Sequence, residues 1–302
     1  MSDAPNVEDA RTLHAASENL LEQARKKAIE LTEGGRTIDD HQVLTERVAY
    51  AATEARAIRE LIQHVERAQA EGIKDPAFEL SCVAGAAELA RRIHDRLAPA
   101  VDELGLGDAA LEETFPAATR ALLRRAGSDA VMKTLGQETL ARGGRIEWPL
   151  DEMHDQVRDQ VREFGTQEVL PRAEHIHRQD ELVPEEFITK MGELGFFGLS
   201  VPEEYGGVEM GNLAMILTTE ELSRASLAAA GSLITRPEIL TKALLGGGTE
   251  EQKAHWLPKL ASGEIMVGVS VTEPDIGSDV ASVKCRAERA TVDGEDGWVI
   301  NG

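Results

Sequence analysis

Apolar residues recur in alternating steps of four and three along residues 44–65, which restricts this segment to an α-helix that buries one narrow face. The series is Leu44, Val48, Ala51, Ala55, Ile58, Ile62 and Val65. A second series repeats the spacing: Val83, Ala87, Ala90, Ile93 and Leu97. Such heptad seams pack against neighbouring helices. The segment "DPA" at 75–77 separates them as a helix stop and start signal. We therefore predict two helices that approach closely through small alanine side chains.

The rest of residues 1–148 extends this helical pattern. A third helix is expected from Ala109 to Ala126, interrupted by Pro116. Four histidines (His14, His41, His64, His94) are scattered here without the i,i+4 spacing of metal ligands. We expect residues 1–148 to form a helical N-terminal extension that serves packing or assembly, without metal.

Charge and composition exclude some classes of partner. The 302 residues carry a formal net charge of −22, whereas binding to nucleic acid or to an anionic membrane needs clustered Lys and Arg. A small anionic ligand stays possible, because a local pocket can be positive. The start, "MSDAPNVEDA", lacks the apolar core of a signal peptide, and no stretch has the ~20 apolar residues of a membrane span. We expect a soluble, cytoplasmic protein.

Cys82 and Cys285 lack metal-ligand spacing and are expected to be two buried thiols, with a disulfide as the alternative.

A boundary is expected at "ARGGRIEWPL" (141–150), and residues 149–263 then read as a second helical domain. Pro171 should kink or break the helix that begins near Asp151. Further helices are predicted over 183–195 and over 212–224. Thr249 and Gln252 have the spacing of a capping box, and in the helix that follows Trp256 and Leu260 should face the core.

The periodicity changes after Ser262-Gly263. Residues 265–272 form an apolar, β-branched run and are predicted as a buried strand. Alternation at 283–288 predicts a half-buried strand, "VDGEDG" at 292–297 a turn, and 298–302 a strand entering an Asn-Gly hairpin turn. We interpret residues 264–302 as the start of an incomplete β-domain, and the sequence as a fragment of a longer protein.

The chemistry concentrates in "VTEPDIGSD" (271–279). Thr272 and Ser278 can offer hydroxyls, and the Gly277-Ser278 backbone can offer N–H groups, to a phosphate or a heteroaromatic ring. The three carboxylates of this stretch are expected to fix the turn by accepting backbone N–H groups. On its own, Gly-Ser-Asp is a weak signal, and an ordinary turn is the favoured interpretation.

"VGVSVTEPDIGSDVAS" resembles the signature of the acyl-CoA dehydrogenase family. "MGELGFFGLSVPEEYGG", "EELSRAS" and "GTEEQKAHWLPKLASGE" are similar to further motifs of that family, in the same order. The resemblance covers residues 151–302. It implies a mainly α fold with a small β-domain, and a flavoenzyme that uses FAD to convert an acyl-CoA thioester to a trans-enoyl-CoA.

The resemblance also implies site residues and partners. The FAD contacts would come from Val269, Ser270, Val271, Thr272, Gly277 and Ser278. Thr272 would hydrogen-bond the flavin ring, and Ser278 would also touch the substrate. The catalytic glutamate of the family lies downstream, so no catalytic residue is expected within 1–302. Glu203, Glu204, Glu220 and Glu221 are expected to be exposed acids. Electrons would pass to an electron-transferring flavoprotein, and the protein would be a homodimer or another homo-oligomer.

The extra residues before position 149 resemble an extended branch of the family that converts (2S)-methylsuccinyl-CoA to mesaconyl-CoA. Such a substrate carries a free carboxylate, which needs a cationic partner. Arg236, in "SLITRPEIL" (232–240), is our candidate for substrate binding, and the alternative is a surface arginine paired with Glu238. Other functions kept open are another short or branched-chain acyl-CoA dehydrogenase, an acyl-CoA oxidase or flavin monooxygenase of the same fold, and a non-enzymatic assembly module.

Overall fold

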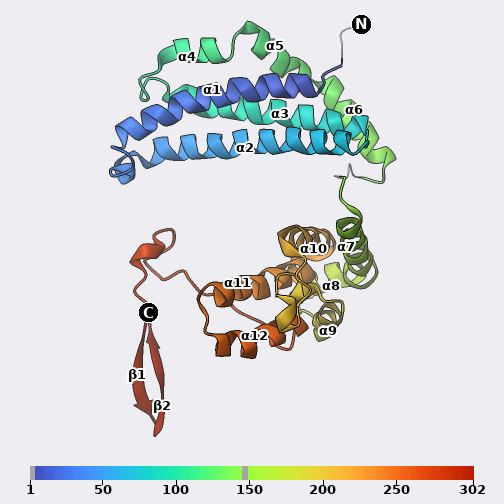
Figure 1. Ribbon diagram of the computed structural model, residues 1–302, viewed down its shortest axis with the longest axis vertical. Coiled ribbons are helices and arrows are strands. Elements are labelled where there is room, and N and C mark those ends of the chain that lie inside the picture. Colours follow the sequence, from blue (N-terminus) through green and yellow to red (C-terminus); the bar gives the residue numbers. More distant parts are fainter. Residues whose placement is uncertain (1–3, 145–148) are drawn as a thin grey trace. The chain divides into compact units, whose positions relative to one another are not determined.

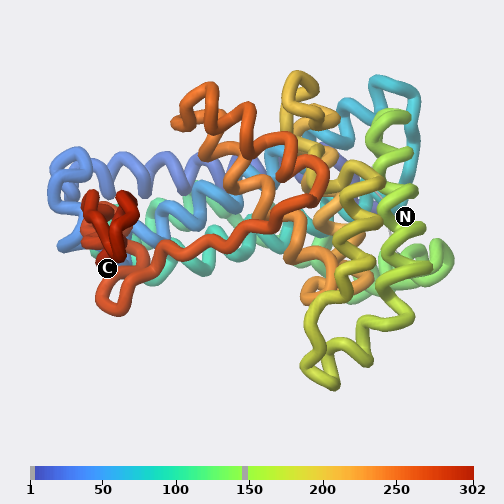
Figure 2. The backbone as a smooth tube through the Cα atoms, turned by 90° about the horizontal axis from the view of Figure 1, so that it is seen from below, coloured from blue at the N-terminus to red at the C-terminus, as the bar shows by residue number. Residues whose placement is uncertain are grey.

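The computed structural model describes residues 4–144 and 149–302. The chain divides into two compact units, Met1–Pro149 and Leu150–Gly302, traced in Figure 1 and Figure 2. None of the described helices combines the length and apolar character that crossing a bilayer requires. The proposed domain limits (1–148, 149–263 and 264–302) stay predictions.

The first unit is a helical bundle. Three long helices, α1 (Val7–Leu31), α2 (Gln42–Ala70) and α3 (Pro76–Leu97), lie side by side and pack pairwise (Figure 1). The two predicted seams lie in α2 and α3, and every member of both is buried. Their alanines let the helices approach closely, as the spacing predicts.

Shorter helices cover this bundle: η1 (Ile38–His41), η2 (Ala98–Ala100), α4 (Gly107–Thr114), α5 (Ala117–Ala126) and α6 (Asp129–Ala141). Pro116 ends one helix and begins the next, as predicted, because it cannot supply an N–H to the helix interior. At the start of α3, Asp75 caps the N–H groups of Ala77 and Phe78. The same carboxylate accepts a hydrogen bond of 2.9 Å from Arg142, which ties the end of α6 to the start of α3.

The second unit has helices α7 (Glu152–Phe164), α8 (Leu170–Gln179), α9 (Glu185–Glu193), α10 (Gly211–Ser226), α11 (Ser232–Gly247) and α12 (Glu250–Ser262). Short turns lie between them: η3 (Gly165–Val169), η4 (Phe196–Gly198), η5 (Glu203–Tyr205) and η6 (Leu227–Gly231). A further turn, η7 (Val280–Ser282), follows α12. One apolar core includes Phe164, Phe187, Met191 and Leu222. A second is built around Val201, Leu257 and Leu260.

Pro171 is accommodated in an unexpected way. The chain widens into a π-turn at η3 before the proline, and Pro171 then sits in the first turn of α8. First-turn N–H groups have no acceptor within their own helix, so the missing donor costs nothing there. The predicted interruption is therefore present, as a local widening.

Other helix predictions in this unit are confirmed with one exception. The helices over 183–195 and 212–224 correspond to α9 and α10, and Thr249 and Gln252 form the capping box of α12. Leu260 is buried as expected, but Trp256 is 41% exposed. The prediction for Trp256 is wrong, because Leu257 takes the buried position next to it.

Two strands, β1 (Arg286–Val292) and β2 (Glu295–Asn301), form an antiparallel hairpin (Figure 1) with Arg286 opposite Asn301. The connecting residues Asp293 and Gly294 both have positive φ, the backbone that Asp-Gly favours in a two-residue turn. The predicted turn is confirmed in a narrower form, and the strand predicted over 298–302 corresponds to the end of β2. The half-buried strand predicted from Val283 is wrong. It begins at Arg286, and almost every residue of β1 is exposed.

The buried strand predicted over 265–272 is absent. After α12 the chain is drawn out (Figure 2), but no described backbone segment pairs with residues 265–272. Ile265, Met266 and Val267 pack against the helical cores, and residues 268–272 are exposed. A strand exists only through its partner's hydrogen bonds, so an apolar β-branched run alone does not make one. The predicted fold class, mainly α with a small β part, is confirmed.

Candidate functional site

The first candidate site is the loop from Val269 to Cys285, between α12 and β1. At its centre residues 273–276 form a tight turn. The Glu273 N–H donates to the Ile276 carbonyl at 2.9 Å, and the Ile276 N–H donates back to the Glu273 carbonyl at 3.2 Å. Ile276 is buried, unlike the residues around it. The turn is thus fixed by paired backbone bonds and one apolar anchor.

Glu273 closes the loop across its base. Its carboxylate accepts the Lys284 N–H at 3.0 and 3.1 Å and the Cys285 N–H at 2.6 Å. The expectation that acids fix this turn is confirmed for Glu273. It is wrong for Asp275 and Asp279, whose side chains accept no hydrogen bond from any described residue. Cys285 itself is exposed and free, and so is not the buried thiol predicted, whereas Cys82 is free and buried.

The hydrogen-bond donors proposed for a ligand all lie on this loop, on either side of the turn. Thr272, Gly277 and Ser278 are exposed. Within the described chain, their hydroxyls and the N–H groups of Gly277 and Ser278 have no acceptor. Where a Cβ would stand on Gly277 there is open space, with nothing within 4 Å. Because Glu273 is turned toward the strand, it is not directed at a ligand on these donors.

These donors suit a ligand with phosphate oxygens and ring acceptors, such as FAD. Val269, Ser270 and Val271, the other residues predicted to line it, are also exposed, on the drawn-out segment before the turn. Arg236 lies elsewhere, on α11. No group of three or more His, Cys, Asp or Glu among the described residues could hold a metal ion.

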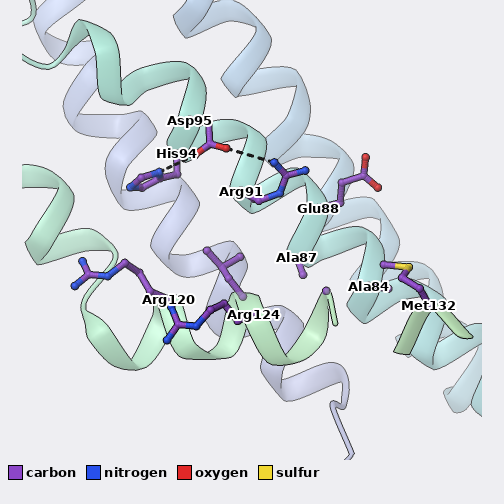
Figure 3. A pocket seen from close by; sticks show the side chains of 11 residues that line it. Ala84, Ala87, Glu88, Arg91, His94, Asp95, Arg120, Arg124 and Met132 are labelled. Atoms are coloured by element: carbon purple, nitrogen blue, oxygen red, sulfur yellow. Dashed lines mark hydrogen bonds and ion pairs between the residues drawn. The ribbon is translucent and has the colours of Figure 1, made fainter. Parts of the chain in front are cut away.

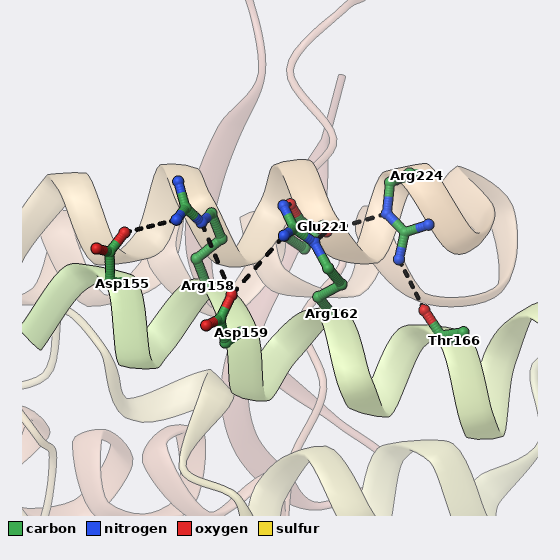
Figure 4. Close-up of polar contacts among 7 residues, drawn as sticks. All are labelled: Asp155, Arg158, Asp159, Arg162, Thr166, Glu221 and Arg224. Carbon is green, nitrogen blue, oxygen red and sulfur yellow. Dashed lines mark hydrogen bonds and ion pairs between the residues drawn. The ribbon is translucent and has the colours of Figure 1, made fainter. Parts of the chain in front are cut away.

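A second polar cluster joins α7 to α10 (Figure 4). Arg162 of α7 donates to both oxygens of Glu221 at 2.6 and 3.0 Å. Arg224 adds a bond of 3.0 Å to Glu221 and donates to Thr166 at 2.8 Å. Glu221 is only 4% exposed. Burial acts to raise the pKa of Glu221, but the two guanidinium groups outweigh it, and the pKa lies below its ordinary value.

This arrangement corrects a sequence prediction. Glu203, Glu204 and Glu220 are exposed as expected, but Glu221 is buried. The sequence did hold a signal, since Glu221 falls on the buried face of α10 four residues after Leu217. A carboxylate held on both oxygens and kept ionised is a poor proton acceptor, so Glu221 has a structural role rather than that of a catalytic base.

Comparison with known proteins finds one family match in the second unit and relatives that align with part or all of the chain. Residues 151–264 match the family described as "Acyl-CoA dehydrogenase, N-terminal domain". A (2S)-methylsuccinyl-CoA dehydrogenase of Cereibacter sphaeroides is 33% identical, over 100% of this chain and 57% of that protein. A mitochondrial 2-methylacyl-CoA dehydrogenase of Solanum tuberosum is 40% identical, over 51% of this chain and 36% of that protein.

Among solved structures, a glutaryl-coenzyme A dehydrogenase in complex with glutaryl-CoA is 37% identical, with a TM-score of 0.45. The match covers 52% of this chain and 39% of that chain. The chain thus spans 57% or less of the length of these three relatives.

Proposed function

We propose that the chain takes part in FAD-dependent α,β-dehydrogenation of an acyl-CoA thioester, because residues 151–264 match the family of acyl-CoA dehydrogenase N-terminal domains. The product would be a trans-enoyl-CoA. The observation that carries the proposal is the family match, which falls on the unit that also holds the loop 269–285.

The finer proposal concerns the substrate, (2S)-methylsuccinyl-CoA, with mesaconyl-CoA as product. Its support is the extent of one similarity. The relative named for this substrate aligns with 100% of the chain, including the helical first unit, whereas the 2-methylacyl-CoA dehydrogenase aligns with 51%. The alignment with the first protein therefore includes the residues that form the helical first unit of this chain.

We propose that the loop holds FAD through the exposed donors already described. Thr272 would donate to the flavin ring, and the N–H groups of Gly277 and Ser278 would donate to phosphate oxygens. Ser278 would also meet the substrate, and Val269, Ser270 and Val271 would line the same site. When bound, FAD would accept the hydride that leaves the substrate Cβ. The Cα proton would go to a base outside residues 1–302.

Arg236 is the proposed partner of the substrate's free carboxylate. The Arg236 side chain is exposed on α11 and makes no hydrogen bond or ion pair with a described residue. The alternative, a surface pair with Glu238, is not present. Glu238 instead contacts Lys242 at 2.7 Å. A guanidinium without an internal partner can give its full charge to a ligand carboxylate.

The remaining proposals concern the electron acceptor, the oligomeric state and the cellular compartment. An electron-transferring flavoprotein would take the electrons, the protein would assemble as a homodimer, and it would act in the cytoplasm. None of these rests on a contact within the described chain.

A flavin assay tests the function. The protein, with any sequence its gene encodes beyond Gly302, is purified and titrated without oxygen with methylsuccinyl-CoA, glutaryl-CoA and isovaleryl-CoA. Substrate should bleach the visible absorption of bound flavin, on the order of one equivalent per site. Absence of bound flavin after reconstitution with FAD would overturn the cofactor assignment. Rapid reoxidation by O₂ with product bound would point to an oxidase instead.

Arg236→Gln tests the substrate proposal. The ratio of kcat/KM for methylsuccinyl-CoA to kcat/KM for 2-methylbutyryl-CoA should fall by about tenfold or more, because only the first substrate has the free carboxylate. The control is Arg178→Gln, which removes an exposed arginine whose partner, Glu174, is one turn away on α8. An equal loss on both substrates would show that Arg236 does not read the carboxylate.

A further inference from the structure

A groove of about 550 Å³ runs along the first unit, between α3 and the segment from α5 to the start of α6 (Figure 3). This volume is within the range of about 300–1,000 Å³ typical of small-molecule sites. Its apolar lining comes from Ala84, Ala87, Leu123 and Met132. Alanines on α3 leave the space open, because a larger side chain there would reach toward α5.

Basic side chains outnumber acidic ones at the groove's edge by one. Arg91 on α3 and Arg120 and Arg124 on α5 line it, against two acids, Glu88 and Asp95 (Figure 3). Three positive and two negative side chains leave a formal charge of +1 with neutral histidine, on a chain whose net charge is −22. The groove is therefore a local exception to the acidic character of the protein.

Both acids are already engaged. Glu88 accepts a hydrogen bond from Arg92, which lies outside the groove. Asp95 accepts one from Arg91 at 3.4 Å and lies 3.1 Å from Nδ1 of His94. Their negative charge is thus partly neutralised by cations of the same helix.

Arg124 differs from the other two arginines. Arg120 donates to the Phe115 carbonyl at 2.8 Å and pairs with Glu112 at 3.0 Å. Arg124 has no hydrogen bond or ion pair with any residue in the part of the chain that the structure describes. Its guanidinium, one turn along α5 from Arg120, keeps all its donors for a ligand.

We propose that this groove binds an aliphatic carboxylate, with its carboxylate on Arg124 and its chain along Ala84, Ala87 and Met132. A planar carboxylate matches the fork of a guanidinium. The excess of one positive charge suits a monoanion, whereas a nucleotide or phosphate ester would bring further negative charge beside Glu88 and Asp95. This site is separate from the loop 269–285 and does not depend on the proposed dehydrogenation.

Calorimetric titration of the full chain with sodium octanoate tests the proposal, with 1-octanol as the uncharged probe. Octanoate should bind saturably and octanol about tenfold or more weakly, because the octanol hydroxyl cannot replace a charge-assisted pair. Arg124→Gln should lower the affinity for octanoate by about tenfold and leave the affinity for octanol unchanged. Met132→Glu, at a position 43% exposed, should weaken both probes, since it places charge in the apolar part of the groove.

The matched control is Lys133→Gln. It removes one positive charge from an exposed position on α6 that does not line the groove, so octanoate affinity should change by less than about twofold. Circular dichroism checks that each variant keeps its helices. The proposal is overturned if octanoate does not saturate, if octanol binds as well, or if Arg124→Gln and Lys133→Gln have equal effects.

Discussion

Replacing Arg162 with Met should loosen α7 from α10 more than any exposed arginine replacement would. Glu221 is 4% exposed and takes two of its three guanidinium bonds from Arg162. Removing one partner of a buried ion pair costs about 3–5 kcal/mol, because the other charge stays buried. Arg224 remains, so we expect the lower end, about 3 kcal/mol.

Hydrogen exchange measured by mass spectrometry reports this loss locally. At about 1.36 kcal/mol per factor of ten, exchange protection in peptides of α7 and α10 should fall by roughly a hundredfold. Peptides of α1, α2 and α3 belong to the other unit and provide the internal reference. Arg178→Gln, which breaks an exposed pair, should change protection by less than about fivefold.

A double replacement separates loss of the pair from loss of packing. Arg162→Met combined with Glu221→Leu removes both charges and keeps apolar volume, so protection should recover most of the way to wild type. The reasoning fails if the single replacement lowers protection by less than about threefold. It also fails if the double variant is as poorly protected as the single one.

Three further outcomes follow from caps and protonation. Thr249→Ala removes the 3.2 Å hydrogen bond that the Thr249 hydroxyl accepts from the Gln252 N–H. It should destabilise the start of α12 by about 1 kcal/mol, which hydrogen exchange in that segment would measure. No change in exchange would show that the capping box does not stabilise the helix. Since the folded-state pKa of Glu221 lies below its ordinary value of 4.5, its stabilisation is present above that value and is lost as pH falls through the folded pKa. Glu221→Gln should therefore flatten the fall of α7 and α10 protection below pH 4.5, and parallel curves would contradict this. Burial raises the pKa of Cys82 to about 11, so iodoacetamide at pH 8 should label the exposed Cys285 first, and equal labelling rates by mass spectrometry would refute the prediction.

Local sequence patterns predicted most helices well. The seams in α2 and α3, the break at Pro116 and the box at Thr249 depend on residues within a few positions of each other. Each pattern therefore indicates a helix, its break or its start without information about distant residues. The turn at Asp293-Gly294 belongs to the same class, because its positive φ angles suit those two residues.

The candidate site was predictable only in part. The run of donors at Thr272, Gly277 and Ser278 was visible in the sequence, and the structure leaves them without internal acceptors. The role of Glu273 depends on backbone groups eleven and twelve residues later. Asp275 and Asp279 carry the same carboxylate as Glu273, yet no described residue donates a hydrogen bond to either side chain.

By itself, the sequence determined where helices start and stop, and it carried the motifs that match a known family. Only the tertiary structure determined that residues 265–272 do not form a strand and that Glu221 is buried. A strand needs a partner's backbone, and no described segment pairs with 265–272. A buried carboxylate needs a cation, and Arg162 supplies it from 59 positions away. Both depend on groups distant in the chain, and local spacing carries no information about where such groups meet.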